Sequence, residues 1–185
     1  MKAGQIVSKL RLKDGCNVTI RTPRARDIDG FLALINGLVK EDAMILMDKP
    51  FKRKEEVLWL RNLLKELKTG KTIYLLAEVN GKIVGGTNVT KHLGKSKHVG
   101  GFGISIKDGY RDIGLGTTLA KEVIKQAKKS GLKLLLLEVF DQNPRAIHMY
   151  EKIGFREVGR IPKKLYHKGR YHSGIQMAKE ISSMK

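Results

Sequence analysis

The sequence predicts an α/β domain built on a mixed, mostly antiparallel sheet that contains one parallel β-α-β unit and is flanked by helices. Residues 104–106 alternate in hydrophobicity and lead through a glycine loop into a helical pattern, and a second strand of the buried type follows at residues 132–139. A strand, a helix and a strand in this order predict two parallel strands with a right-handed connection. In addition, an Asn-Gly pair at residues 80–81 separates apolar runs at 73–79 and 82–89, which is typical of a type I′ hairpin.

The N-terminal part predicts two further strands. Residues 5–12 have the pattern of a strand, and a turn at residues 13–15 leads into a second strand at 18–21. Residues 1–16 are therefore interpreted as an N-terminal strand extension. No repeat, low-complexity tract or proline-rich linker divides the sequence, so a single domain is expected to cover residues 1–185.

Two helices are expected next. Apolar residues recur at helical spacing over residues 28–39 and again over residues 54–68, with a loop at 41–52 between them. The same spacing predicts that the second helix buries Val57, Leu60, Leu64 and Leu67.

The region around the β-α-β unit carries loop and strand-end signals. Residues 90–100 are expected to form an exposed connection, and Gly101 and Gly103 predict an irregular strand after it. Farther along, Asn143 and Pro144 have the residue types of a helix N-cap and a first helical position, and Gly154 ends that helix.

An antiparallel pair at residues 155–164 and 170–178 is expected to close the sheet.

Composition places the chain among globular proteins. Hydrophobic residues make up 41% of its 185 residues, and no run approaches the roughly 18 apolar residues of a membrane helix. The N-terminus lacks the apolar stretch of a secretory signal, and a single cysteine, Cys16, offers neither an internal disulfide nor a metal cluster. These features favour a cytoplasmic protein with no membrane partner and no metal.

The formal net charge of +19 is large for this length. Basic residues cluster near the N-terminus, including Arg21, and again between Arg160 and Arg170 without an acid among them. Such a field attracts nucleic acid, ribosomes or an acidic peptide. The alternative is an ordinary solvated, lysine-rich surface.

The loop at residues 107–116 has the features of an anion-binding seat. Gly114 and Gly116 lack a Cβ and let backbone N–H groups approach a ligand, and the following helix adds the positive end of its dipole. Arg111 supplies a permanent charge beside them. A glycine turn that serves only the fold is the alternative.

Two segments together resemble the GNAT superfamily of acetyl-CoA-dependent N-acetyltransferases. The first is Ile104-Ser-Ile-Lys-Asp-Gly-Tyr-Arg-Asp-Ile-Gly-Leu-Gly116. The second contains Leu137-Glu-Val-Phe-Asp-Gln-Asn143 and Tyr150-Glu-Lys-Ile-Gly-Phe155. Order and spacing both match, and the resemblance is strong over residues 73–160. It implies acetyl-CoA as co-substrate and an amine of a small molecule, protein or peptide as acceptor.

The resemblance also implies a cofactor site. The strand would pair its main chain with the pantetheine arm, the glycine loop would hold the pyrophosphate, and Lys152 would approach the adenosine end. The implied cofactor-binding residues are Ile104, Ser105, Ile106, Arg111, Asp112, Ile113, Gly114, Leu115, Gly116, Thr117, Asn143 and Lys152.

Two catalytic residues follow from the same resemblance. Glu138 matches the acid that acts as general base in ribosomal-protein amino-terminal acetyltransferases, although it could also face solvent or pair with Lys133. Tyr150 matches the tyrosine thought to act as general acid, although an aromatic ring there could serve packing alone. A backbone N–H near Gly103 or Ile104 would stabilise the oxyanion.

The acceptor side is less defined. Met44, Ile45, Met47 and Phe51 resemble the substrate-facing wall of the family but also suit a core, and Ser173 stands where several branches carry Asp. A catalytically inert CoA-fold module that binds RNA or ribosome through its basic surface is the alternative function, and a homodimer is an open assembly state.

Overall fold

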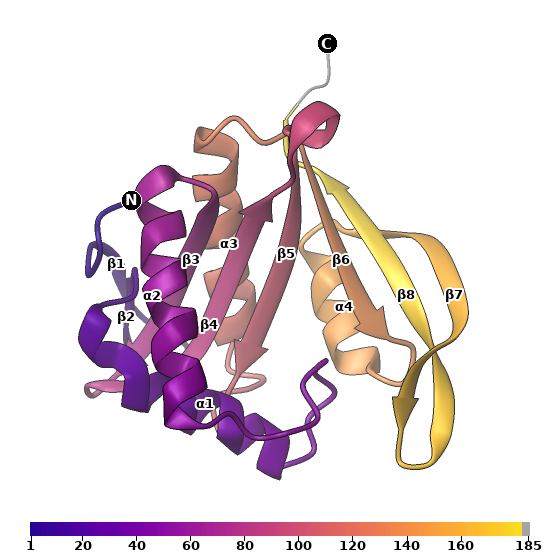
Figure 1. Cartoon of the computed structure of the whole chain (residues 1–185), viewed down its shortest axis with the longest axis horizontal. Helices are drawn as coiled ribbons and strands as arrows, with labels where there is room; N and C mark the ends of the chain where they lie inside the picture. The colour runs from indigo at the N-terminus through magenta and orange to yellow at the C-terminus, as the bar shows by residue number, and fades with distance from the viewer. Residues whose placement is uncertain (183–185) are drawn as a thin grey trace.

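The computed structural model describes residues 1–182, and within them eight strands form one mixed sheet in the order β1-β2-β3-β4-β5-β6-β8-β7 (Figure 1). The strands are β1 (Ile6–Arg11), β2 (Asn17–Arg21), β3 (Thr72–Val79), β4 (Lys82–Lys91), β5 (Val99–Ile106), β6 (Leu134–Phe140), β7 (Arg156–His167) and β8 (Arg170–Glu180). In this part of the chain β5 and β6 pair in parallel and the other neighbours pair antiparallel. The predicted fold class is confirmed.

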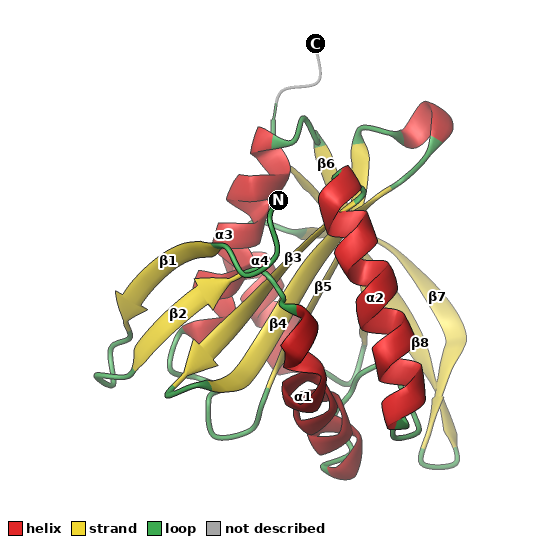
Figure 2. Ribbon diagram, turned by 60° about the vertical axis from the view of Figure 1, so that its left-hand side comes forward, coloured by secondary structure: helices red, strands yellow, loops and turns green. Residues whose placement is uncertain are grey.

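The helices cover both faces of the sheet, as Figure 2 shows. They are α1 (Ile28–Lys40), α2 (Arg53–Thr69), α3 (Leu115–Lys129) and α4 (Pro144–Lys152). Helices α1 and α2 lie on one face, and α3 and α4 lie on the other. The strand residues alternate accordingly, so that Leu75 packs in the cluster with α3 while Leu76 packs in the cluster with α1 and α2.

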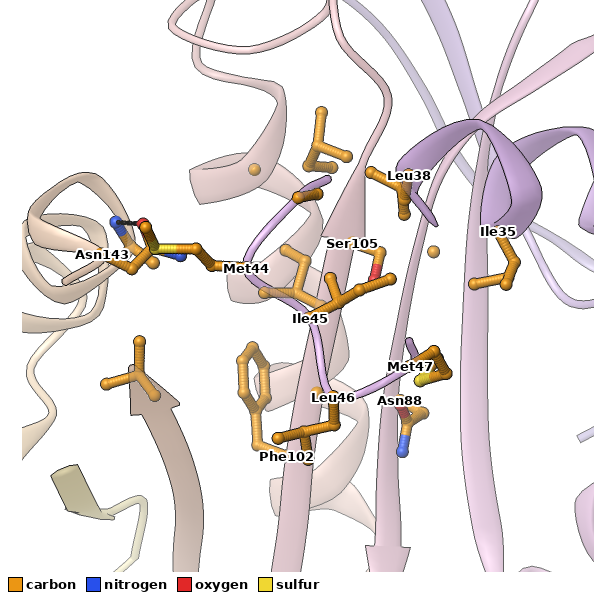
Figure 3. A pocket seen from close by; sticks show the side chains of 18 of the residues that line it. Ile35, Leu38, Met44, Ile45, Leu46, Met47, Asn88, Phe102, Ser105 and Asn143 are labelled. Carbon is orange, nitrogen blue, oxygen red and sulfur yellow. Dashed lines mark hydrogen bonds between the residues drawn. The ribbon is translucent and has the colours of Figure 1, made fainter. Parts of the chain in front are cut away.

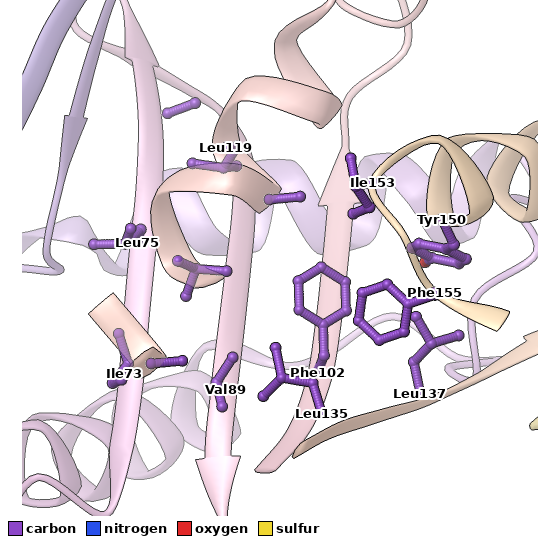
Figure 4. Packing of buried hydrophobic residues seen from close by; sticks show 14 of the residues in the cluster. Ile73, Leu75, Val89, Phe102, Leu119, Leu135, Leu137, Tyr150, Ile153 and Phe155 are labelled. Atoms are coloured by element: carbon purple, nitrogen blue, oxygen red, sulfur yellow. The ribbon is translucent and has the colours of Figure 1, made fainter. Parts of the chain in front are cut away.

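The larger core lies under α3 and α4 (Figure 4). Phe102 from β5 contacts the ring of Tyr150 from α4 edge-on, with centroids 6.0 Å apart, and lies 5.4 Å from the ring of Phe155. Helix α4 begins and ends as the sequence predicts: the Asn143 side chain accepts a hydrogen bond from the amide of Ala146, and Gly154 has φ +92° after its last turn.

Strand β5 has the irregularity predicted at Gly101 and Gly103 on its β6 side, where strand pairing ends at Gly101, and not on its β4 side. Its register with β4 is continuous from Gly100 to Ile106. Gly100 and Gly103 allow side chains of the neighbouring strand β4 to approach the β5 backbone closely. A Cβ at Gly103 would lie 2.9 Å from Oδ1 of Asn88, and one at Gly100 would lie 2.6 Å from Cγ1 of Val89. The predicted exposed loop is also shorter, because residues 90–91 belong to β4 and residues 99–100 to β5.

Helix α2 is rotated relative to its predicted orientation. Its buried residues are Glu56, Leu60, Leu63 and Leu67, so Leu60 and Leu67 are correct while Val57 and Leu64 are only half-buried. The difference arises because hydropathy spacing places a carboxylate on the solvent side, whereas the fold buries Glu56.

Several cations of the basic runs are paired within the fold. Arg21 is buried and forms ion pairs with Asp27 and Glu78, both with N–O distances of 2.6 Å, so it adds nothing to the surface field. On the β7–β8 hairpin, Lys164 pairs with Glu138. The positive charge of residues 160–170, a run without acidic residues, is therefore partly neutralised by a carboxylate from another strand.

Candidate active site

A cavity opens where β5 and β6 part. The two strands pair only over Val99–Gly101 of β5, so the edge of β5 from Phe102 to Ile106 has no strand partner on the β6 side among the described residues (Figure 1). Residues of both strands line a cavity of about 1140 Å³ in this opening. Ile104, Ser105 and Ile106 line it, as the sequence analysis expects.

The first turn of α3 borders the same cavity and presents free N–H groups. Gly114 is the N-cap with φ +86°, a conformation that glycine adopts without strain, and no side chain caps the helix. Within residues 1–182, the amides of Leu115, Gly116 and Thr117 donate no hydrogen bond, whereas the Thr118 amide donates to the Gly114 carbonyl. Three unpaired donors at a helix start are groups that can bind an anion.

Two guanidinium groups lie beside these amides. Arg111 donates from Nε to the Ile106 carbonyl (2.9 Å) and pairs with Glu41, and Arg145 pairs with Asp112 at 3.0 Å. Burial, and then the positive charge of Arg145, lowers the pKa of Arg111, which shows that the two cations lie within electrostatic reach of each other. An added anion would relieve this repulsion.

The remaining predicted cofactor residues divide into two groups. Gly116, Thr117, Asn143 and Lys152 line the cavity together with Asp112. Leu115 is fully buried and Ile113 packs against the larger core, so the side chains of these two residues serve the fold and only their backbone groups can face a ligand. Asn143 uses Oδ1 to cap α4.

Glu138 lies on β6 at the wall of the cavity. Its neighbours Leu137 and Val139 pack in the core under α3 and α4, so the alternation of the strand places Glu138 toward the α1–α2 face. Its carboxylate, 16% exposed, accepts hydrogen bonds from Lys164 and Gln176. The partner is thus Lys164 rather than Lys133.

Tyr150 reaches the cavity from the opposite face of the sheet. The Tyr150 side chain is 8% exposed and packs on Phe102 and Phe155, yet Tyr150 also lines the cavity. The hydroxyl has no hydrogen-bond partner in the described chain, and burial raises its pKa to about 12. The ring therefore packs in the core and also presents a protonated hydroxyl.

The segment between α1 and α2 covers part of the cavity. Figure 3 shows Met44, Ile45, Leu46 and Met47 along this segment, close to Ser105 and Phe102 in the view, and all of them line the cavity. Both its ends are held: Asn36 exchanges two hydrogen bonds with the backbone of Phe51, of 2.9 and 3.1 Å, and Asp42 bonds His167 and Lys168 of the β7–β8 hairpin. The predicted substrate-facing wall therefore borders the cavity.

Sequence reasoning missed a polar group on the α1–α2 face. Glu56 of α2, Tyr74 of β3 and Asn88 of β4 line the same cavity. Glu56 is 3% exposed, its Oε1 has no hydrogen-bond partner in the described chain, and burial raises the pKa of its carboxyl. The signal available in the sequence was a Glu at position 56, in register with Leu60, Leu63 and Leu67, on a helix whose other faces are strongly charged.

Glu56→Gln is expected to stabilise the protein by about 1–2 kcal/mol at pH 7, because an ionised carboxylate without a partner is costly to bury. Since the folded pKa lies above the unfolded value of about 4.3, the wild type loses stability as pH rises above that value, and the two proteins converge below it. Thermal unfolding from pH 3.5 to 7.5 measures this. The exposed helix residue Glu151 offers the control Glu151→Gln, for which no such divergence is expected. A constant difference between Glu56→Gln and wild type over this range would contradict the assignment.

In the described part of the chain, no three His, Cys, Asp or Glu side chains are grouped to hold a metal ion. No helix of residues 1–182 has the length and apolar character needed to cross a membrane.

Solved structures share this fold. An acetyltransferase of the GNAT family from Streptococcus pneumoniae superposes with a TM-score of 0.80 at 31% identity, over 88% of this chain and 99% of that one. The protein yncA from Salmonella typhimurium, solved with its cofactor acetyl-CoA, has the same TM-score at 19% identity, over 91% of this chain and 96% of that one. The fold is thus shared with an acetyltransferase of the GNAT family.

Sequence comparison gives the family. The profile of the acetyltransferase (GNAT) family matches residues 39–155, and the chain belongs to this family. An uncharacterised N-acetyltransferase of Methanocaldococcus jannaschii is 31% identical over 144 residues, which is 75% of this chain and 61% of the relative. The match thus spans less than two thirds of that relative.

Proposed function

We propose that this protein transfers the acetyl group of acetyl-CoA to an amino group of a small molecule, protein or peptide. The observation that carries the proposal is the coincidence of three features in one cavity: a free strand edge, uncapped helix amides, and a carboxylate and a phenol approaching from opposite faces of the sheet. Family membership supports the same reaction.

The residues present fit acetyl-CoA. The unpaired edge of β5 from Phe102 to Ile106 would hold the pantetheine amides as an added strand does. The amides of Leu115 to Thr117 and the guanidinium of Arg111 would hold the pyrophosphate, and Lys152 at the end of α4 would approach the adenosine end. Acetyl-CoA supplies an activated thioester whose C–S bond breaks as the C–N bond to the amine forms.

The chain's own residues would manage the protons. The pKa of a lysine-type amine lies about three units above neutral pH, so forming its free base at pH 7 costs on the order of 4 kcal/mol. Glu138 would accept that proton directly or through water, and Tyr150 would donate to the departing sulfur. A main-chain N–H at Gly103 or Ile104 would stabilise the charge that develops on the carbonyl oxygen.

Glu138→Gln is expected to lower turnover most at low pH, where the amine most needs a base, and to recover partly as pH approaches the pKa of the amine. The measurement is release of free CoA thiol against a panel of primary amines from pH 6 to 10. The control is Glu157→Gln, which changes an exposed carboxylate on β7 that pairs with Arg160 of the same strand, and it should match wild type. Wild-type turnover of Glu138→Gln across this range would remove Glu138 from the mechanism.

The comparisons give no support to an inert module. Association with nucleic acid or ribosome and a homodimer stay predictions from the sequence.

A further inference from the structure

Glu56 is a buried carboxyl group that the acetyl transfer proposed above does not use. It projects from α2, is 3% exposed, lines the cavity, and has an oxygen, Oε1, that is buried without a hydrogen-bond partner in the described chain. Within residues 1–182 it forms no ion pair. Buried carboxylates are normally paired, so an unpaired one that faces a cavity indicates a cationic ligand.

The groups around Glu56 suit an alkylammonium ion. Trp59 of α2 and Tyr74 of β3 line the same cavity as Glu56, with ring centroids 5.8 Å apart, and aromatic rings attract cations. Burial, and then the negative charge of Glu56, raises the pKa of Tyr74, so the carboxylate and the phenol lie close in space. Gly86 leaves room for the hydroxyl, because a Cβ there would lie 2.9 Å from the Tyr74 oxygen.

Glu56 differs from the other carboxylates of the cavity in having no cationic partner. The lining includes six carboxylates, and the five paired ones are Glu41 with Arg111, Asp42 with Lys168, Glu66 with Lys71, Asp112 with Arg145 and Glu138 with Lys164. Among these six described residues, Glu56 is the one without an ion pair. The three Lys and Arg residues of the lining are Arg111, Arg145 and Lys152, all in the glycine loop or α4, at the end proposed for acetyl-CoA. The general positive field of the surface is screened within about 8–10 Å, so the contacts inside the cavity decide which acceptor is held.

We propose that Glu56, with the rings of Trp59 and Tyr74, forms a subsite for a second cationic group of the acceptor. The acceptor class is therefore an amine that carries a further alkylammonium group, either a free aliphatic diamine or a peptide with a lysine side chain. This inference rests on the proposed acetyl transfer, because it specifies the acceptor class of that reaction. Its binding step does not require that any acetyl group be transferred.

Matched probes with and without the second charge test the subsite. 1,5-Diaminopentane is compared with pentylamine, and alanyl-lysine amide with alanyl-norleucine amide, so that each pair differs in one ammonium group. Binding is measured by calorimetry with CoA present, and kcat/KM is measured at saturating acetyl-CoA. Wild type should prefer the charged member of at least one pair by about 10- to 100-fold, as expected for one charge-assisted contact. The pair that shows the preference identifies a free diamine or a peptide as the source.

Glu56→Gln should remove this preference and leave the uncharged member unchanged, and Glu151→Gln should change neither. Glu56→Asp keeps the charge but shortens the side chain, and should retain part of the preference, which separates charge from folding. Equal binding of both members by wild type would overturn the inference. Equal loss of both in Glu56→Gln would also overturn it, because the residue would then act on the fold or the chemistry.

The two proposals fail separately. If the charged probe binds in a Glu56-dependent way but no amine is acetylated, the subsite stands and the proposed function is wrong. If amines are acetylated at rates that depend neither on Glu56 nor on the second charge of the acceptor, the proposed function stands and the subsite is wrong.

Discussion

Tyr150→Phe is expected to lower kcat by roughly 10²-fold or more while the affinity for acetyl-CoA barely changes. The substitution removes the hydroxyl and keeps the ring that packs against Phe102 and Phe155. Because burial raises the pKa of Tyr150 to about 12, the hydroxyl keeps its proton across the neutral range, and its contribution to kcat should persist up to about pH 10. Single-turnover kinetics measure the chemical step and calorimetry measures the affinity.

The control is Tyr171→Phe, since Tyr171 is 67% exposed on the β7–β8 hairpin. It should keep the wild-type kcat. A wild-type kcat for Tyr150→Phe, measured where chemistry limits the rate, would reduce Tyr150 to a packing residue and make water the proton donor.

Gly114→Val is expected to weaken acetyl-CoA binding by about 10²-fold or more. A β-branched residue at φ +86° is strained by about 1–2 kcal/mol, and relief of that strain turns the free amides of α3 away from the phosphate. Losing one or two charge-assisted hydrogen bonds gives a reduction of this size. Calorimetry with acetyl-CoA measures it.

Gly131→Val is a matched control at the other end of α3. Gly131 also has φ +86°, and a Cβ added there would have no neighbour within 4 Å, so both variants should lose similar stability while Gly131→Val keeps its affinity. Gly116→Val provides an independent check, because a Cβ there makes an ordinary 3.7 Å contact with Ile106 and the fold should accept it, yet its side chain would stand before the amides. Unchanged affinity in folded Gly114 and Gly116 variants would place the phosphates elsewhere.

Local signals in the sequence were sufficient for most of the fold. The type I′ turn at Asn80-Gly81, the cap at Asn143 and the helix stop at Gly154 depend on a few adjacent residues, and the structure contains each of them. The parallel pair followed from the order of strand, helix and strand. In the same way, the glycine loop indicated the free amides before α3 was placed beside β5.

The missed features depend on contacts between distant segments. Hydropathy spacing cannot place a carboxylate in a helix–sheet interface. The predicted orientation of α2 was therefore wrong in part, and the burial of Glu56 was not predicted. Pairing of Arg21 with Glu78, 57 residues away, and of Glu138 with Lys164, 26 residues away, likewise requires the folded sheet. Charge counts along the sequence therefore overstated the free positive surface.

The parting of β5 from β6 also determines where the sheet can bend. Seven register pairs join β4 to β5 and seven join β6 to β8, but three join β5 to β6, from Val99 to Gly101. The sheet thus consists of two parts, β1–β5 and β6–β8–β7, whose strand pairing joins them at one corner that contains the adjacent Gly100 and Gly101. Strand pairing between the two parts is confined to residues 99–101, so a change in the width of the cavity would disturb the fewest backbone hydrogen bonds of the sheet if it occurred about this corner.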